Sequence, residues 1–227
     1  MYTADAKAHI TEVVISIRER LRYSGNELLD ELIESSSSVL FYGVAGAGKT
    51  SLLLTIAGNL CSAYSCVYIT TEETTHYEHI ARNPDRYKQA LFTEAYDLST
   101  LVKVTYAVFI LRPRYIFVDS LNAPFRLEAL KENALAKYGF ATSLLLSTAE
   151  ASGGKLFASA QVRAGETGDL EITGFKLLDF YFDAILGVFI ESAGIRFIKP
   201  LKTLFATKFE KLYFRITDEG VKWLDRT

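Results

Sequence analysis

The stretch VLFYGVAGAGKTS, residues 39–51, decides the fold. It contains Gly43-Val-Ala-Gly-Ala-Gly-Lys-Thr50, which matches the pattern G-x-x-x-x-G-K-[ST] in full. The apolar run from Val39 to Tyr42 predicts a short strand before the glycines, and the run from Lys49 to about Leu60 predicts a helix after them. A strand, a glycine loop and a helix in this order form the context that the motif requires.

This glycine loop has the composition of a phosphate-binding site. Glycines let successive backbone N–H groups point inward at a phosphate, and the start of the helix adds its dipole. Lys49 would place a cation on the β- and γ-phosphates, and the Thr50 hydroxyl would bind Mg²⁺. A glycine-rich turn with a chance Lys-Thr pair fits the strand–loop–helix context less well. The predicted nucleotide-binding residues are Gly43, Val44, Ala45, Gly46, Ala47, Gly48, Lys49, Thr50 and Ser51.

A phosphate-binding loop of this kind also needs a carboxylate on the metal side, at the end of a neighbouring strand. The segment Arg114-Tyr-Ile-Phe-Val-Asp119 is an apolar strand that ends in an aspartate. Many buried strands end in this way, so the pattern alone is weak. Because it follows the glycine loop in the chain order that such proteins use, we predict that Asp119 is the Walker B residue and binds Mg²⁺.

The rest of the chain alternates between apolar strands and helices. The strands predicted after the glycine loop are residues 66–70, 90–92, 115–118 and 155–160, and the helices between them are residues 98–111 and 127–151. Nearly all-apolar strands separated by helices indicate a mostly parallel sheet that helices cover on both faces. Short strands predicted at residues 184–191, 195–199, 212–217 and 221–224 indicate an antiparallel extension of the same sheet.

The length of 227 residues is typical of a single α/β domain with one full core. Apolar residues at helical spacing from Ala6 to Leu21 predict an amphipathic first helix, and residues 27–33 predict a second. We therefore expect an N-terminal helical segment, residues 1–34, packed on a core formed by residues 35–227.

The charge and the cysteine content limit which classes of function are expected. The formal charge of −2 gives no global positive field for nucleic acid. The only two cysteines, Cys61 and Cys66, are expected to be reduced thiols. The N-terminus has no signal-peptide pattern, and no stretch approaches the ~20 apolar residues of a membrane span. We therefore expect a cytoplasmic protein with no membrane partner.

Two local clusters invite a functional interpretation. His76-x-x-His79 lies beside Glu72 and Glu73, but zinc motifs on helices place histidines at i and i+4, so surface residues are favoured over a metal site. The cations between Ile195 and Arg215 are either a nucleic-acid footprint or a solvated strand face. They are Arg196, Lys199, Lys202, Lys208, Lys211 and Arg215, against the single acid Glu210.

Several segments, in a common order, resemble the RecA-superfamily ATPases. Val67-Tyr-Ile-Thr-Thr-Glu72-Glu73 resembles the strand end that carries the water-activating glutamate, and its doubled Thr-Thr-Glu-Glu is most similar to the KaiC-like and archaeal RadA-paralogue branch. Leu156-Phe-Ala-Ser-Ala-Gln161 resembles the strand that carries a γ-phosphate sensor. The segment from Ser24 to Leu32 and the C-terminal strands resemble the corresponding parts of RadA, RadB and KaiC-like proteins. Departures include Ser35–Ser38 in place of a glycine-rich turn, and Lys199-Pro-Leu-Lys202 in place of a K-x-R pattern.

The resemblance implies a RecA-like P-loop ATPase core that binds ATP and Mg²⁺. Glu72, or else Glu73, would activate the attacking water, Lys49 would neutralise charge on the phosphoryl group, and Gln161 would report the γ-phosphate to the loop of residues 162–173. Lys199 and Lys202 would reach the ATP of a neighbouring subunit, or would be lysines on a solvated strand edge. Arg163 is the only cation of the 162–173 loop, so a DNA contact there would rest on it.

Two functions follow from this resemblance. The first is a RadA paralogue that assists homologous recombination and DNA repair, binds single-stranded DNA, hydrolyses ATP slowly in a DNA-dependent way, and meets a RadA-type recombinase or copies of itself. The alternative is a KaiC-like regulatory or archaellum-assembly ATPase that acts as a nucleotide-gated scaffold without DNA. A third, a chain that binds nucleotide only structurally, would show no dependence of turnover on Glu72.

Overall fold

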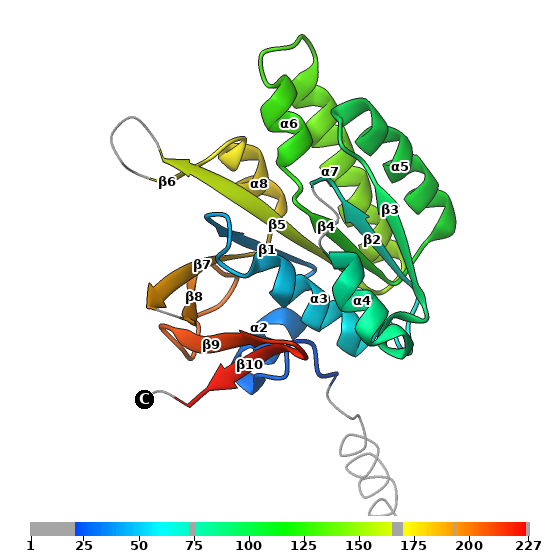
Figure 1. Ribbon diagram of the computed structural model, residues 1–227. Helices are drawn as coiled ribbons and strands as arrows, with labels where there is room; N and C mark the ends of the chain where they lie inside the picture. The colour runs from blue at the N-terminus through cyan, green and yellow to red at the C-terminus, as the bar shows by residue number, and fades with distance from the viewer. Residues whose placement is uncertain (1–20, 73–75, 165–169, 193, 226–227) are drawn as a thin grey trace, which may run out of the picture.

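The computed structural model describes residues 21–72, 76–164, 170–192 and 194–225 (Figure 1). Within these residues, a ten-stranded sheet has the order β10-β9-β8-β7-β1-β5-β4-β2-β3, and β6 pairs with β5 off this path. The first helix expected from residues 6–21 lies almost wholly outside them. No helix in the described part of the chain is both long and apolar enough to cross a membrane.

The strands and helices have the following bounds. The strands are β1 (Ser38–Gly43), β2 (Cys66–Thr70), β3 (Ala90–Glu94), β4 (Tyr115–Asp119), β5 (Lys155–Ala164), β6 (Leu170–Ile172), β7 (Ala184–Ser192), β8 (Ile195–Lys202), β9 (Leu212–Thr217) and β10 (Gly220–Leu224). The helices are α2 (Glu27–Glu34), α3 (Lys49–Leu60), α4 (His76–Arg82), the 3-10 helix η1 (Pro84–Tyr87), α5 (Leu98–Leu111), α6 (Ala123–Glu128), α7 (Ala134–Ala151) and α8 (Phe175–Tyr181).

Six neighbouring strands, from β7 through β1, β5, β4 and β2 to β3, are parallel, so their carboxyl ends share one edge of the sheet. At this edge Gly43 of β1 pairs in register with Gln161 of β5, and Thr70 of β2 pairs with Asp119 of β4. The prediction of a mostly parallel sheet with an antiparallel C-terminal extension is therefore confirmed. The register also brings the expected site residues to one edge.

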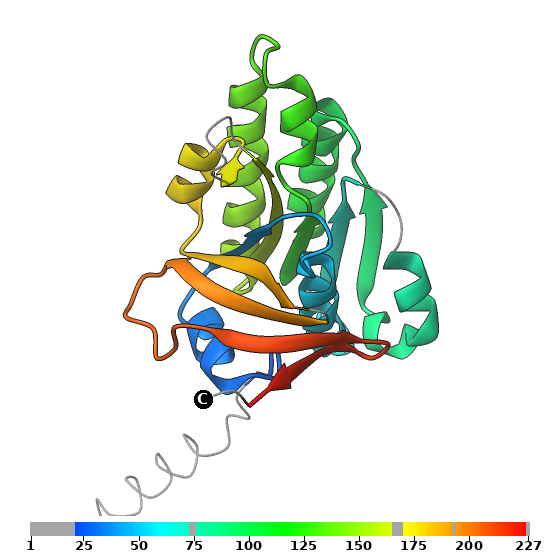
Figure 2. The ribbon, with the colours of Figure 1, turned by 60° about the vertical axis from the view of Figure 1, so that its left-hand side comes forward.

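Helices cover both faces of this sheet (Figures 1 and 2). Successive side chains of a strand point to opposite faces. In β1, Val39 and Phe41 join the core beneath α2 and α3, whereas Leu40 joins the core beneath α5, α7 and α8. Burial on both faces explains why the strand sequence is apolar throughout rather than alternating.

A ladder of aromatic rings crosses the α3 face of the sheet. Ring centroids are separated by 5.4 Å between Phe92 and Tyr68, 5.8 Å between Tyr68 and Phe117, and 5.1 Å between Phe117 and Phe157. Tyr23, from the segment before α2, continues the ladder at 6.3 Å from Phe157. Tyr68, Phe117 and Phe157 are fully buried in strands that end at the site, so they hold those strand ends in place.

The C-terminal strands β8, β9 and β10 extend the sheet by antiparallel pairing from β7. The indole of Trp223 in β10 packs against Phe214 at 5.6 Å between ring centroids and donates a hydrogen bond of 2.9 Å to the carbonyl oxygen of Ser24. In α2, Leu29 and Ile33 are fully buried in the same core. The first and last described segments of the chain therefore pack together. The proposed division of the chain at residue 34 stays a prediction.

Three local predictions were wrong. The helix expected over residues 127–151 is divided into α6 and α7, because Asn133 adopts a left-handed conformation, with φ of 62°, between them. The loop expected after Gln161 is partly strand, since β5 continues to Ala164 and β6 pairs with it in an antiparallel ribbon. In addition, α8 was not predicted at all.

The expectation of two reduced cysteines was also wrong, because Cys61 and Cys66 form a disulfide. Cys61 is the C-cap of α3, and Cys66 is the first residue of β2. A tight turn brings the helix end and the strand start together, with 5.7 Å between the two Cα atoms, which is within the range of disulfides. The sequence spacing alone did not reveal this approach.

Candidate nucleotide-binding site

The glycine loop leaves β1 at Gly43 and enters α3 at Lys49. Gly48 has a φ of 106°, a conformation that residues with a Cβ rarely adopt. Gly43 lies so close to β7 that a Cβ there would be 2.4 Å from the carbonyl oxygen of Val188. Both positions of the motif therefore require glycine for a local backbone reason, and the loop can close over the start of α3.

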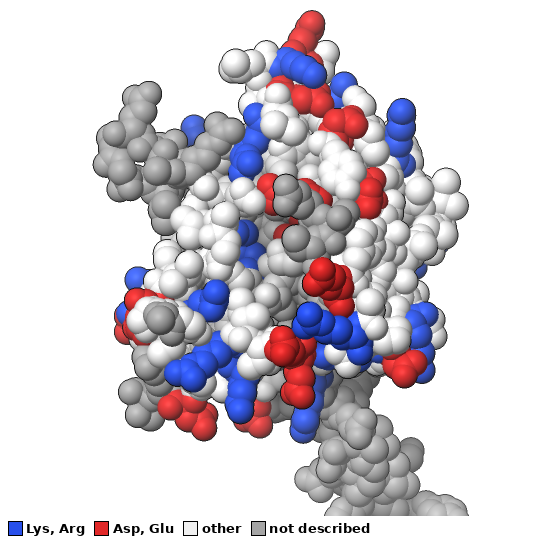
Figure 3. Space-filling view, in the orientation of Figure 1, with Lys and Arg blue, Asp and Glu red and all other residues white. Residues whose placement is uncertain are grey.

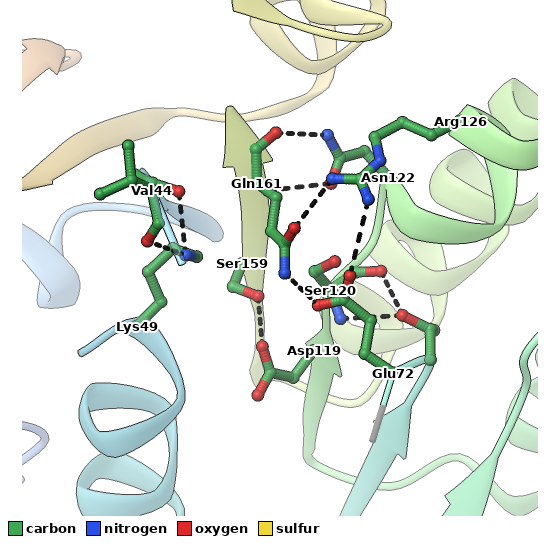
Figure 4. A network of polar contacts seen from close by, with 11 residues as sticks. Val44, Lys49, Glu72, Asp119, Ser120, Asn122, Arg126, Ser159 and Gln161 are labelled. Atoms are coloured by element: carbon green, nitrogen blue, oxygen red, sulfur yellow. Dashed lines mark hydrogen bonds and ion pairs between the residues drawn. The ribbon is translucent and has the colours of Figure 1, made fainter. Parts of the chain in front are cut away.

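Lys49 is buried at the start of α3 and turned back onto its own loop (Figure 4). Its Nζ donates hydrogen bonds of 2.9 Å to the carbonyl oxygens of Gly43 and of Val44. Burial lowers the pKa of Lys49, whereas the nearby carboxylates of Asp119 and Glu72 act in the opposite direction. An ammonium group held inside a glycine loop is suited to binding an anion there.

Asp119 lies at the end of β4, where it is only 9% exposed. Tyr68 donates a hydrogen bond of 3.1 Å to its Oδ2 atom, and Ser159 donates one to its Oδ1 atom. Burial raises the pKa of Tyr68, and the Asp119 charge raises it further, so the phenol stays a neutral donor. The two donors fix the orientation of the Asp119 carboxyl group. The peptide between Asp119 and Ser120 is cis.

Glu72 follows β2 and is linked to Gln161 of β5 (Figure 4). The side-chain amide of Gln161 donates a hydrogen bond of 2.6 Å to Glu72 Oε2. Arg126 of α6 donates one of 2.9 Å to Gln161 Oε1, and its Nη2 lies 3.9 Å from Glu72 Oε1. Burial raises the pKa of Glu72, and the Arg126 charge opposes this shift. The glutamate, the glutamine and the arginine therefore form one closed polar cluster.

The same cluster is anchored through the backbone. Asn122, the N-cap of α6, donates a hydrogen bond of 2.9 Å to the Gln161 carbonyl oxygen, and its Oδ1 atom accepts one of 3.0 Å from the Gln161 N–H group. This reciprocal pair fixes the start of α6 against β5 at Gln161. As a result, Arg126 has a defined position relative to Gln161.

The sequence predicted four of the residues at this edge, namely Lys49, Glu72, Asp119 and Gln161. It did not predict that Arg126, Asn122 and Ser159 would contact them. Arg126 and Asn122 come shortly after Asp119, where Asn122 is the N-cap of α6, which begins at Ala123, and Arg126 lies in that helix. A helix start soon after β4 was the available signal. It was obscured because the apolar pattern of residues 127–151 drew the expected helix start to Leu127.

Other predicted contacts lie apart from this cluster or outside the described residues. Lys202 donates a hydrogen bond to the carbonyl oxygen of Asp179 and lies 3.7 Å from its carboxylate. Lys199 is exposed on β8, where it lines a shallow, open pocket of about 420 Å³ with the segment Thr207–Glu210. Arg163 lies in β5, opposite Glu171, but its side chain is outside the described part of the chain. Glu73 and the side chains of His76 and His79 are outside it as well.

Surface charges are mixed rather than gathered into a basic tract on the face seen in Figure 3. Lys208, one of the cations between residues 195 and 215, has its Nζ 2.6 Å from a carboxylate oxygen of Glu31. Arg196 lies over the glycine loop, with Nη2 3.4 Å from the Gly46 carbonyl oxygen. Thus Lys202, Lys208 and Arg196 contact the chain itself.

A glycine loop between a strand and a helix, followed by an aspartate at the end of a neighbouring parallel strand, defines a P-loop nucleotide-binding fold. The solved structure described as the crystal structure of the RadB recombinase shares this fold, with a TM-score of 0.73, 21% identity, and coverage of 88% of this chain and 98% of that chain. No family model matches the chain.

A comparison of sequences also finds a similar protein. The protein named DNA repair protein RadA, from Pseudomonas aeruginosa, is 27% identical over 221 residues, which are 92% of this chain and 46% of that protein. The chain therefore spans about half the length of this relative. The two similarities confirm the resemblance to the RadA- and RadB-like proteins of the RecA superfamily.

Proposed function

We propose that this chain is an ATP-binding ATPase of the RecA type that acts in homologous recombination and DNA repair. One observation carries the proposal: Lys49, Asp119, Glu72 and Gln161 come from four separate elements and converge at the carboxyl edge of the parallel sheet. The similarity to a DNA repair protein RadA and to a RadB recombinase supports the recombination and repair context.

The residues present fit ATP and Mg²⁺. The glycine loop and the buried Lys49 ammonium would hold the phosphates, while the Thr50 hydroxyl and the Asp119 carboxylate would hold Mg²⁺, which prefers oxygen ligands. Tyr68 and Ser159 already fix the orientation of the Asp119 carboxyl group. When bound, ATP with Mg²⁺ supplies a phosphoryl group that can be transferred to water.

Glu72 would accept the proton of the attacking water. Its burial raises its pKa from the ordinary range of a carboxyl group, which makes it a stronger base at neutral pH. Gln161 holds the carboxylate by a hydrogen bond of 2.6 Å, so it would link the state of the base to the ribbon formed by β5 and β6. We expect slow, DNA-dependent hydrolysis and binding of single-stranded DNA.

A second candidate function is the nucleotide-gated scaffold that does not bind DNA. It is favoured by the ion pairs of Lys202 with Asp179 and of Lys208 with Glu31, because a cation engaged by the chain's own acid gains less from a phosphate. In either case Lys199 would reach the ATP of a neighbouring copy, and the partner would be such a copy or a RadA-type recombinase.

The test is a titration with single-stranded DNA, with and without ATP, at two salt concentrations. The repair function predicts ATP-dependent binding whose logarithmic affinity falls linearly with the logarithm of the salt concentration. Lys49→Ala is the control, because it should remove the ATP dependence. No binding at low salt, together with nucleotide-dependent assembly, would select the scaffold function.

The role of Glu72 is tested separately by Glu72→Gln, which keeps the size and the hydrogen bonding of the side chain. We expect the ATP turnover rate to fall by roughly 100-fold or more, as is usual when a general base is removed, while the protein still binds ATP. An unchanged turnover rate would show that Glu72 is not the base.

A further inference from the structure

Arg126 lies between the two residues that are proposed to meet the γ-phosphate. Its guanidinium donates to the Gln161 side chain at 2.9 Å and lies 3.9 Å from the Glu72 carboxylate. The Arg126 side chain is only 18% exposed. Arg126 belongs to α6, Glu72 follows β2, and Gln161 lies in β5. These residues are far apart in the sequence and are brought together by the fold (Figure 4).

The bonding of Arg126 in this arrangement is incomplete. A guanidinium has five N–H donors in a rigid fork. Its contact with Gln161 is to a neutral amide, its contact with Glu72 is long, and its buried Nε has no hydrogen-bond partner within the described residues. A buried cation with unused donors binds more strongly to an anion that can satisfy them.

Its charge already acts on the site. The positive charge of Arg126 acts to lower the pKa of Glu72, and it acts in the same direction on the pKa of Lys49. The carboxylates of Asp119 and Glu72 offset these two cations when no nucleotide is bound, and a further anion could bind both cations. The γ-phosphate is the anion that the proposed function would bring there.

We propose that Arg126 is an arginine finger supplied by the chain itself, which exchanges Glu72 for the γ-phosphate when ATP binds. The inference rests on the proposed function and deepens it. Without nucleotide, Arg126 engages the base. With the γ-phosphate bound, the guanidinium contacts the phosphate oxygens, and the Glu72 carboxylate is released to take the proton of the attacking water.

The backbone that carries Arg126 is held in place by hydrogen bonds. Asn122 and Gln161 form two reciprocal hydrogen bonds that hold the start of α6 against β5. Arg126 lies in that short helix, one turn after Asn122, and Arg126 N donates a 2.9 Å hydrogen bond to the Asn122 carbonyl oxygen. The backbone under Arg126 is therefore fixed, while its long side chain can change partners.

The competing explanation is that Arg126 only neutralises Glu72 and holds α6 to the sheet. The two explanations differ in what they predict for ligands with and without a group at the γ position. If the role of Arg126 is structural, a variant should lose the same factor of affinity for ADP and for an ADP–aluminium fluoride complex, or lose affinity for neither. An arginine finger predicts a loss confined to the complex that carries the γ mimic.

The experiment compares the binding of ADP with Mg²⁺ to that of ADP with Mg²⁺ and aluminium fluoride. For Arg126→Ala we expect ADP affinity within about twofold of the unmodified protein and a roughly 100-fold or greater loss of affinity for the aluminium fluoride complex, in the range found for groups that stabilise developing charge. Arg126→Lys should recover part of that loss. Arg114→Ala, which changes an arginine that packs on Tyr64 away from the site, should leave the ratio of the two affinities unchanged.

The possible outcomes separate the inference from the proposed function. If the unmodified protein binds neither ligand, the proposed function fails, and this inference fails with it. If it binds both and Arg126→Ala leaves the ratio unchanged, the inference is overturned, whereas nucleotide binding stands. If Arg126→Ala does not fold, the same ratio measured for Arg126→Lys and Arg126→Gln decides, since the glutamine variant keeps hydrogen-bonding capacity without charge.

Discussion

The carboxyl edge of the parallel strands and the antiparallel extension both carry many polar side chains, but they use them in opposite ways. At the parallel edge, Glu72, Asp119 and Gln161 come from or follow three different strands and lie at one edge of the sheet, where Glu72 and Gln161 contact each other. In the extension, Lys202 and Lys208 point to separate places and pair with Asp179 and Glu31 of their own chain.

The difference arises from strand direction. Parallel strands end at one edge, so each strand places its last side chain beside that of its neighbours, and a few polar residues share a single space. Antiparallel strands alternate their ends, and their exposed side chains are spread over a face. A cluster of cations in sequence therefore does not become a cluster in space in the extension, whereas scattered residues do become one at the parallel edge.

The sharpest test of this contrast concerns the core beneath each region. Phe157 is fully buried in the aromatic ladder under the site, whereas Phe197 of β8 is half-buried. We expect Phe157→Ala to lower the free energy of unfolding by about 3–5 kcal/mol, and Phe197→Ala to lower it by markedly less. Urea unfolding followed by circular dichroism measures both. Equal losses would mean that the extension is as tightly built as the parallel part.

A second test compares one lysine from each region. Lys49→Ala should weaken binding of ATP with Mg²⁺ by roughly 100-fold, because a hydrogen bond to a charged group contributes about 1.5–3 kcal/mol. Lys199→Ala should change the affinity of isolated protomers by no more than about twofold, since Lys199 is exposed on β8. Equilibrium binding of a fluorescent ATP analogue is the measurement. If Lys199→Ala weakened ATP binding strongly, but only at high protein concentration, this would indicate that Lys199 contacts the ATP of a neighbouring copy.

The parallel part should also be the more sensitive to high pH. Burial raises the pKa of Tyr68, and likewise that of Tyr138 in α7, so folding favours the neutral phenols. Their contribution is fully present below the ordinary tyrosine pKa of about 10 and is lost as the pH rises above it. We expect the free energy of unfolding to fall between about pH 10 and pH 12, by about 1.4 kcal/mol for each pH unit and each such tyrosine.

The matched variant for this test is Tyr68→Phe, which removes one titrating group and keeps the ring in the ladder. Its unfolding free energy should depend less steeply on pH in that window than that of the unmodified protein. Identical pH dependence would assign the alkaline loss to other groups.

The smallest effect belongs to the ion pair of Lys208 and Glu31. The two side chains are 68% and 39% exposed, and solvent-exposed pairs of this kind contribute about 0–1 kcal/mol. A double-mutant cycle with Lys208→Ala and Glu31→Ala should return a coupling below about 1 kcal/mol that declines with added salt. The single variant Lys208→Ala should therefore fold normally and be usable to test whether this cation contributes to DNA binding. A coupling well above that value would mean that the extension is fastened to α2 more firmly than its exposure indicates.

The sequence predicted the parts of the molecule that local patterns determine. The glycine motif requires its residues at fixed spacing, and β2, β4, α3 and α5 are apolar segments bounded by clear breaks, so their positions were expected within one or two residues. Asp119 was expected from its place at the end of an apolar strand after the glycine motif, whereas Glu72 and Gln161 were expected from the resemblance to the RecA superfamily.

The parts that were missed depend on approaches between residues that no local pattern encodes. Arg126 matters because α6 begins immediately after β4 and is pinned to Gln161 by Asn122. The disulfide between Cys61 and Cys66 depends on the geometry of one turn. Likewise, the ribbon of β5 and β6 forms because the chain reverses and pairs with itself, and the apolar content of residues 162–172 did not reveal that.

Trp223, the only tryptophan in the sequence, has an optical consequence. Its indole N–H is bonded to Ser24, and its ring rests on Phe214, so its fluorescence reports whether the last strand is docked on the segment before α2. When tryptophan is excited selectively, any shift in the emission comes from the surroundings of Trp223. The protein therefore carries an intrinsic probe that can separate release of β10 from the segment before α2 from changes at the candidate nucleotide site.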